Sequence, residues 1–257
     1  MKKFIGILLT IFMAVSLAAC GSESGGNTPA ESQRPVSTQP PTSSPVKDGI
    51  ESNGPQGDND PETPAPEDDT EQGSNILVAY FSRVGNTVWE DGVDAVTSAS
   101  LNVVDGVFFG NAQLLAQMAQ EVTGGDLFLI QTADTYPSDY RETTNVASVE
   151  QSKNARPELS SHVDNMDQYD TIVLIYPNWW GTLPQALYTF LEEYDFSGKT
   201  ILPLCTHEGS RMGSSERAIA GLCPDATLLD GLAVRGASAA SARSDVEKWI
   251  NDSGILG

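Results

Sequence analysis

The sequence is poor in cysteine, histidine and positive charge. It has 3 Cys and 2 His, and its 14 Lys and Arg stand against 35 Asp and Glu, which gives a formal net charge of −21. Three cysteines cannot form a disulfide scaffold. The histidines, His162 and His207, lack the close spacing of a structural zinc site. Because nucleic acids are bound by basic surfaces, the charge balance argues against a nucleic-acid partner.

The sequence also lacks a serine-hydrolase motif and a pair of cysteines suited to a disulfide. No G-x-S-x-G follows a predicted strand, which argues against a serine hydrolase of that type. Cys205 and Cys223 are predicted to remain two buried thiols. The expected helix between them would separate its ends by about 13 Å at 1.5 Å per residue, which exceeds the Cα reach of a disulfide. A helix that folds back towards the strand would weaken this argument.

The first residues have the pattern of an export signal. Lys2 and Lys3 precede an apolar run from Phe4 to Leu17, which is too short for a stable membrane span. The following Leu17-Ala18-Ala19-Cys20 resembles the lipobox of bacterial lipoproteins. The resemblance implies lipidation of Cys20 and a place at the cell membrane, lipid-anchored on the extracytoplasmic face. The alternative is an ordinary secretory signal that leaves Cys20 as a free thiol.

Residues 21–74 show no hydrophobic periodicity. They contain nine of the chain's 15 prolines, and 11 acidic residues against only Arg34 and Lys47. Such a segment buries too little apolar area to offset the entropy of ordering, so we expect a disordered acidic linker rich in proline, serine and glycine. It would separate the signal peptide of residues 1–20 from a domain of residues 75–257.

The domain alternates short apolar runs with amphipathic segments. Runs that are apolar at both odd and even positions are typical of strands buried on both faces of a parallel sheet. Such strands are predicted at Ile76–Phe81, Leu127–Ile130, Ile172–Tyr176, Ile201–Cys205 and Thr227–Leu232. Helices are predicted at Asn111–Thr123, Tyr140–Lys153, Leu183–Glu193, Ser214–Leu222 and Ser241–Asp252. The alternation predicts an α/β fold with a doubly wound, open, five-stranded parallel sheet.

Ligands of such sheets bind beyond the carboxyl ends of the strands, and three loops there have unusual residues. Ser82–Thr87 can direct backbone N–H groups at an anion, although it also reads as a simple tight turn. Tyr176–Pro184 contains Trp179 and Trp180, which favour a planar ligand between aromatic rings. The alternative is that one ring covers the core and the other a neighbouring loop. Thr206–Ser215 is polar and glycine-rich, so its backbone can approach a ligand.

At these loops the sequence resembles the flavodoxins, in particular bacterial flavodoxin-like proteins with Y-P-N-W-W-G-T and C-T-H-x-G-S blocks, here at 176–182 and 205–210. The resemblance covers about residues 75–235. It implies a flavodoxin-like sheet of order 2-1-3-4-5 and non-covalently bound FMN. It assigns the phosphate to Ser82, Val84, Gly85, Asn86 and Thr87, and the ring to Pro177, Asn178, Trp179, Trp180 and Gly181 in one loop and to Thr206, His207, Glu208 and Gly209 in another. Tyr136 and Tyr140 are further candidates at the ring edge.

One segment departs from the flavodoxin pattern. In flavodoxins the first helix directly follows the phosphate loop, whereas here Val88–Gly110 is inserted. Either the helix is displaced and the backbone of the loop acts alone, or Gly110 and Asn111 supply the helix end from a distance. Arg83 is expected to compensate by pairing with the phosphate.

The resemblance implies electron transfer or flavin-dependent reduction, with a redox donor and acceptor that the sequence does not identify. Aromatic and acidic surroundings are expected to disfavour the anionic reduced flavin and so to lower its reduction potential. No side chain is required as a general acid or base, and no metal site is expected. The insertion leaves a second hypothesis open, a flavin-free lipoprotein domain that binds a small ligand or a partner through the same loops.

Overall fold

The computed structural model describes residues 75–257, except 93–94, 96–98 and 105–106. The predicted signal peptide, the lipidation site Cys20 and the predicted linker of residues 21–74 lie outside the described residues. None of the helices in the described part of the chain combines the length and the hydropathy that a membrane span requires.

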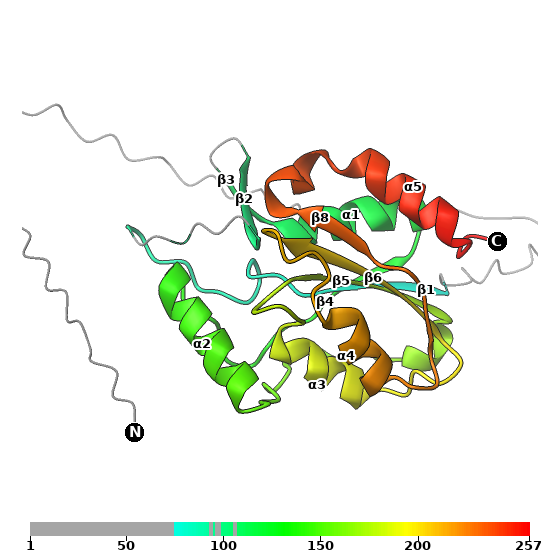
Figure 1. Ribbon diagram of the computed structural model, residues 1–257, viewed down its shortest axis with the longest axis horizontal. Coiled ribbons are helices and arrows are strands. Elements are labelled where there is room, and N and C mark those ends of the chain that lie inside the picture. The colour runs from blue at the N-terminus through cyan, green and yellow to red at the C-terminus, as the bar shows by residue number, and fades with distance from the viewer. Residues whose placement is uncertain (1–74, 93–94, 96–98, 105–106) are drawn as a thin grey trace, which may run out of the picture. The chain divides into compact units, whose positions relative to one another are not determined.

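Six strands form the central parallel sheet (Figure 1). Their order is β4-β1-β5-β6, and β7 and β8 both pair with β6. The predicted fold class and strand order are confirmed, with β7 and β8 sharing the fifth position. The predicted strand Thr227–Leu232 is interrupted near Gly231, whose N–H donates to the Glu216 side chain. The strands are β1 (Ile76–Tyr80), β4 (Asp126–Leu129), β5 (Thr171–Pro177), β6 (Thr200–His207), β7 (Thr227–Leu228) and β8 (Leu232–Arg235).

The central strands are buried on both faces, as their composition predicts. Every residue of β1 and of β5 is buried. Successive side chains of a strand point to opposite faces, and they divide here between two cores. Leu77 and Ile172 belong to one core, and Val78 and Val173 to the other. The sheet therefore sits between two apolar layers, and its loops are held at the rim.

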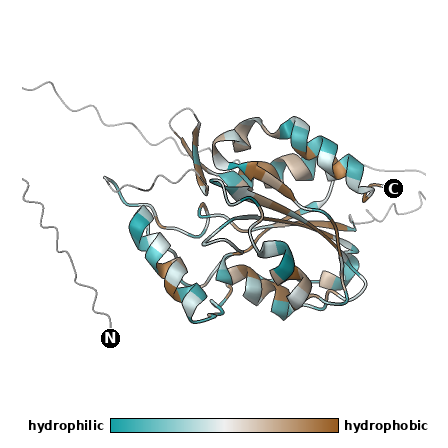
Figure 2. Ribbon diagram, viewed as in Figure 1, coloured by the Kyte–Doolittle hydropathy of each residue, from teal (hydrophilic) through white to brown (hydrophobic). Residues whose placement is uncertain are grey.

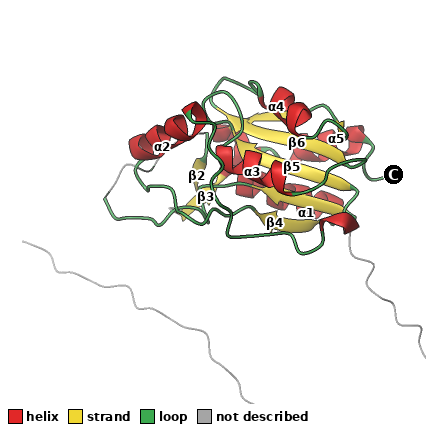
Figure 3. Cartoon of the chain, turned by 90° about the horizontal axis from the view of Figure 1, so that it is seen from below, coloured by secondary structure: helices red, strands yellow, loops and turns green. Residues whose placement is uncertain are grey.

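Helices cover both faces of the sheet. α1 and α5 lie on one face, and α3 and α4 lie on the other (Figures 1 and 3). Hydrophobic residues gather in the strands and hydrophilic residues on the outer sides of the helices (Figure 2). All five predicted helices are present, with bounds that shift by one or two residues. They are α1 (Asn111–Thr123), α2 (Tyr140–Ser152), α3 (Gln185–Glu193), α4 (Ser215–Leu222) and α5 (Arg243–Ser253), with short 3-10 helices η1 (Met166–Gln168) and η2 (Gly236–Ser241).

A second, small sheet was not predicted. Within the Val88–Gly110 insertion, β2 (Leu101–Val104) and β3 (Val107–Gly110) pair antiparallel, with Leu101 opposite Gly110. This hairpin and α2 lie at the same end of the central sheet (Figures 1 and 3). The hairpin returns the chain to the start of α1, which decides the geometry of the loop that follows β1.

The two cysteines within the domain remain unpaired. Cys205 and Cys223 are both free and buried, as predicted. Burial is the main cause that raises the pKa of the Cys205 thiol to about 12 and that of the Cys223 thiol to about 11. Both thiols are therefore protonated at neutral pH, whereas a reactive cysteine needs a lowered pKa.

Candidate functional site

The loop after β1 is held in shape by Asn86. The side chain is 1% exposed, and its amide nitrogen donates to the carbonyl oxygens of Ser82 (2.9 Å) and Ile130 (3.0 Å). Its amide oxygen accepts from the backbone nitrogen and the hydroxyl of Thr132, at 2.8 and 3.0 Å. These four bonds use the full capacity of the amide. The Asn86 side chain thus shapes the loop and ties it to the end of β4.

The N-terminus of α1 lies against the same loop. A Cβ atom built on Gly110 would come within 1.8 Å of the Ser82 hydroxyl oxygen and 3.1 Å of the Ser82 Cβ atom, so the two residues are in close contact. The backbone N–H of Asn111 donates to the carbonyl oxygen of Ser100 in the insertion, at 2.9 Å. Gly110 and Asn111 therefore supply the helix end, as one of the two alternatives expected, but in direct contact with the loop and not from a distance. The insertion leads the chain away and back, and the positive end of the helix dipole still meets the loop.

The loop keeps polar groups that suit an anion. Thr87 is 9% exposed, and its buried hydroxyl has no hydrogen-bond partner among the described residues. The Ser82 hydroxyl accepts from the Val84 N–H at 3.2 Å and can still donate its own proton. Gly85 has a φ of +96°, which favours glycine. A buried hydroxyl without a partner costs about 1–3 kcal/mol, so the loop fits a bound acceptor such as a phosphate oxygen.

Arg83 is engaged elsewhere than predicted. Its side chain donates to three main-chain carbonyl oxygens, those of Ala95 (3.0 Å), Pro137 (2.8 Å) and Ser138 (2.9 Å). It therefore clamps the insertion to the segment before α2, and the expected pairing with the phosphate has no support in this geometry. Burial lowers the pKa of Arg83 to about 10, and the nearby Asp139 partly opposes that effect. The guanidinium is still charged at neutral pH.

Trp179 packs inward and closes one end of the core. Its ring meets Phe81 and Tyr136 edge-on, with ring centroids 5.3 and 5.1 Å away. Its indole nitrogen donates to the Ser100 hydroxyl in the insertion at 3.1 Å. The Tyr136 hydroxyl in turn donates to Glu150 at 3.2 Å, and burial, helped by that carboxylate, raises the Tyr136 pKa. Trp179 thus covers the core, which was the alternative to stacking on a ligand. It also lines a cavity.

Trp180 occupies a strained turn. It has a φ of +53° and the following Gly181 has a φ of +83°. The turn closes through two backbone bonds between Trp179 and Thr182, at 3.0 and 3.2 Å, and positive φ at both central positions defines type I′. A non-glycine residue in this region costs about 1–3 kcal/mol and often marks a functional site. The ring is 57% exposed, and its nitrogen donates to the Thr144 carbonyl of α2 at 3.0 Å.

The two predicted ring-binding loops are joined by Asn178. Its amide oxygen accepts from the Gly181 N–H at 2.9 Å, and its amide nitrogen donates to the Arg211 carbonyl at 3.0 Å. A Cβ atom on Gly213 would lie 2.2 Å from the Gly181 carbonyl oxygen. The loops therefore pack backbone to backbone. The buried hydroxyl of Thr206, at the end of β6, has no partner among the described residues.

His207 closes a small turn at the end of β6. It is 6% exposed, and its Nδ1 accepts from the Gly209 N–H at 2.8 Å. Burial lowers the pKa of His207, and the positive charges of Arg235 and Arg211 lower it further. The imidazole is therefore neutral at pH 7. Glu208, the residue between His207 and Gly209, is exposed to solvent.

A cavity of about 240 Å³ lies between the Trp179–Trp180 turn, α2 and the insertion. Its aromatic walls are Trp179, Trp180 and Tyr140, and Arg83 contributes the charged part of the lining. The other lining residues are Ala99, Ser100, Thr143, Thr144, Ala147 and Asn178. The predicted residues Thr206–Gly209 do not line it, and Tyr136 lines a different cavity of about 300 Å³.

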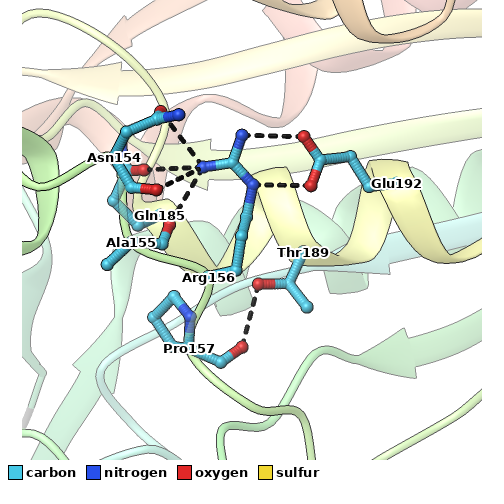
Figure 4. A network of polar contacts seen from close by, with 7 residues as sticks. All are labelled: Asn154, Ala155, Arg156, Pro157, Gln185, Thr189 and Glu192. Carbon is cyan, nitrogen blue, oxygen red and sulfur yellow. Dashed lines mark hydrogen bonds and ion pairs between the residues drawn. The ribbon is translucent and has the colours of Figure 1, made fainter.

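The end of α2 is anchored to α3 by Arg156 (Figure 4). Its guanidinium forms a two-pronged ion pair with Glu192, at 2.6 and 2.7 Å, and also donates to the carbonyl oxygens of Asn154 and Ala155. The Arg156 guanidinium lies over the Tyr188 ring, 5.0 Å from its centroid. This anchor ties the segment that follows α2, the helix that carries one wall of the cavity, to α3.

The sequence did not identify the α2 and insertion residues of the cavity, apart from Tyr140. The signal was present in α2, because Tyr140, Thr143, Thr144 and Ala147 recur at helical spacing on one face. No such signal marks Ala99 and Ser100. Among the described residues, no cluster of three or more His, Cys, Asp or Glu is placed to bind a metal ion.

The comparisons with known proteins agree on one family. A sequence profile of the flavodoxin family matches residues 100–253. A protein of Bacteroides uniformis ATCC 8492 assigned to the flavoproteins shares 30% identity over 70% of this chain and 99% of its own, with a TM-score of 0.53. A second one, from Bacteroides eggerthii DSM 20697, shares 26% sequence identity over 70% of this chain and 98% of its own, with a TM-score of 0.54. A Lactobacillus acidophilus NCFM flavoprotein in complex with FMN shares 18% sequence identity over 68% of this chain and 97% of its own, with a TM-score of 0.46. No curated protein matches the chain.

Proposed function

The chain belongs to the flavodoxin family, and from this premise we propose that it binds FMN and acts in electron transfer or flavin-dependent reduction at the extracytoplasmic face of the cell membrane. Bound FMN would supply the redox chemistry, and the protein would bind and orient it. The donor and acceptor of electrons are unidentified redox partners. No side chain of this chain is needed as a general acid or base.

The proposal that the protein binds the FMN phosphate rests above all on the contact between Gly110 and Ser82. That contact joins the loop of residues 82–87 to the N-terminus of α1. A helix N-terminus and backbone N–H groups together form an anion-binding site. The unpartnered Thr87 hydroxyl and the Ser82 hydroxyl add two donors there. The residues present thus fit a phosphate group.

The ring half of the proposal rests on the cavity beside Arg83. Its walls are aromatic, and it adjoins the phosphate loop because Arg83 belongs to both. Asn178, Trp179 and Trp180 would hold the planar ring there, with Pro177 and Gly181 shaping the turn. Thr206–Gly209 would support that turn from the neighbouring loop through Asn178.

The flavin-free alternative loses its main argument. It rested on the insertion Val88–Gly110, which would have separated α1 from the phosphate loop. Because Gly110 instead lies against Ser82, the insertion preserves the helix end at the loop. We therefore retain the FMN-binding function as the proposal that the geometry supports best.

Titration of FMN with the purified full-length protein tests this proposal. We expect saturable quenching of flavin fluorescence, weakened at least ten-fold in Thr87→Ala, which removes the unpartnered hydroxyl, and in Trp180→Ala, which removes an exposed aromatic wall. Base–aromatic stacking of about 1–3 kcal/mol indicates the size of the second effect. Trp180→Phe is the matched control and should stay within about three-fold of wild type. Absence of quenching in wild type at any concentration would refute FMN binding.

The membrane anchor is a separate part of the proposal and rests on the Leu17-Ala18-Ala19-Cys20 sequence. In a bacterial host, we expect metabolic labelling with a radioactive fatty acid to mark the full-length protein and membrane fractionation to recover it in the pellet. Cys20→Ser should abolish the label and release the protein, because the thiol that accepts the lipid is gone. Cys205→Ser is the control, since that thiol is buried. Labelling that survives in Cys20→Ser would contradict the anchor.

A further inference from the structure

Arg83 is a buried cation that forms no ion pair with a carboxylate among the described residues. Its side chain is 1% exposed, and it donates three hydrogen bonds to neutral main-chain carbonyl oxygens, those of Ala95, Pro137 and Ser138. Its Nε atom is buried and has no hydrogen-bond partner among the described residues. On its other side the guanidinium lies over Trp89, 5.2 Å from the ring centroid. Removing a charge from water is costly unless an opposite charge or a full set of hydrogen bonds compensates.

Clamping two segments does not by itself account for the charge. A neutral donor can also bond to main-chain carbonyls, at a lower desolvation cost. The acidic group that acts on Arg83 is Asp139, whose carboxylate accepts from the Glu142 N–H at the start of α2, at 2.9 Å. Arg83 therefore keeps a positive charge that nothing in the described structure neutralises by direct contact.

The position of that charge is informative. Arg83 lines the same cavity as Trp179, Trp180 and Tyr140. An aromatic cavity with one buried cation at its edge suits a planar molecule that carries, or acquires, negative charge. Two-electron reduction of FMN with uptake of one proton leaves the ring system with one negative charge, with the electrons supplied by the redox donor. At a low effective dielectric constant, a nearby cation favours that form.

We propose that Arg83 stabilises the negative charge of reduced FMN and thereby raises the reduction potential of the bound flavin. This inference rests on the proposed FMN-binding function. It reverses the expectation from composition, which was that the acidic surroundings lower the potential. The net charge of −21 is spread over the whole chain and is screened by salt over about 10 Å, whereas Arg83 acts inside the cavity.

The test compares the affinities of oxidised and dithionite-reduced FMN for the full-length protein. Arg83→Gln should weaken binding of reduced FMN about ten-fold more than binding of oxidised FMN, which corresponds to a two-electron potential lower by about 30 mV. Arg83→Lys keeps the charge and loses the fork, so the ratio of the two affinities should stay within about three-fold of wild type. If Arg83 were only a clamp, both variants would change the two affinities equally and the ratio would not move, which would overturn the inference.

Two further measurements keep the test decisive. Arg217→Gln removes one exposed positive charge that does not line the cavity. This variant should leave the ratio of the two FMN affinities unchanged. If the Arg83 variants do not fold, the affinities of the wild-type protein for oxidised and reduced FMN decide the question. Reduced FMN bound at least as tightly as oxidised FMN supports the inference, and oxidised FMN bound more tightly than reduced FMN overturns it. Failure of wild type to bind FMN in either state would instead refute the proposed function.

Discussion

Replacement of Phe190 with alanine is expected to lower the free energy of unfolding by about 3–5 kcal/mol, the usual range for a buried phenylalanine. Phe190 lies on α3 and is fully buried in the core beneath the sheet. Its ring meets those of Phe128, Tyr194 and Phe196 at centroid distances of 6.1, 5.3 and 6.1 Å. The substitution removes apolar contacts with three neighbouring rings at once and leaves a cavity that these closely packed neighbours cannot fill.

Urea denaturation followed by circular dichroism measures this effect. The matched control is Phe108→Ala on β3, because Phe108 is 41% exposed and stacks on Trp89 alone, at 5.6 Å. We expect that control to cost about 1 kcal/mol or less, since little buried area is lost. A similar loss in both variants would mean that α3 contributes no more to the core than the hairpin does.

Replacement of Gly213 with alanine is expected to weaken FMN binding at least ten-fold and to cost about 1–3 kcal/mol of stability. Gly213 has a φ of +58°, where an alanine is strained. Its Cβ would lie 2.2 Å from the Gly181 carbonyl oxygen and 2.9 Å from the Asn178 amide nitrogen. The Gly181 carbonyl belongs to the Trp179–Trp180 turn and, as a backbone atom, cannot move aside cheaply, and the Asn178 amide is bonded to the same turn. The methyl group should therefore push that turn out of position.

Flavin fluorescence titration and thermal unfolding of the same samples separate the two effects. Gly221→Ala is the matched control, because Gly221 lies in α4 with no atom within 4 Å of an added Cβ. Alanine has the higher helix propensity, by about 0.8–1 kcal/mol, so this variant should be as stable as wild type or more so. Unchanged FMN affinity in Gly213→Ala would show that the contact between the two loops does not position the ring.

The central sheet was predictable because its strands are buried on both faces. A run such as β5, apolar at every position except its first residue, fits few other environments than the middle of a parallel sheet. The edge was predicted less well. The last predicted strand is interrupted near Gly231, whose N–H donates to the Glu216 side chain of α4. No local pattern in the sequence shows this contact.

The sequence of the insertion contains a local signal for a hairpin. Asp105-Gly106 stands between two apolar runs, and Asp-Gly flanked by such runs is typical of a two-residue hairpin turn. Its consequence for the site had no local signal. That Gly110 returns to Ser82 follows from how the hairpin packs, and only the folded chain shows it.

The sequence by itself determined the fold class and the three loops at the carboxyl ends of the strands, because burial and turn chemistry act over a few neighbouring residues. The strand order followed from the resemblance to flavodoxins. Only the tertiary structure decided the use of each side chain. Asn86 shapes its loop, and Trp179 covers the core as well as lining the cavity. Arg83, which was predicted to pair with the phosphate, is a buried cation of the aromatic cavity. These roles depend on atoms that lie far apart along the chain, such as the carbonyl oxygens of Pro137 and Ser138, and residue spacing carries no record of them.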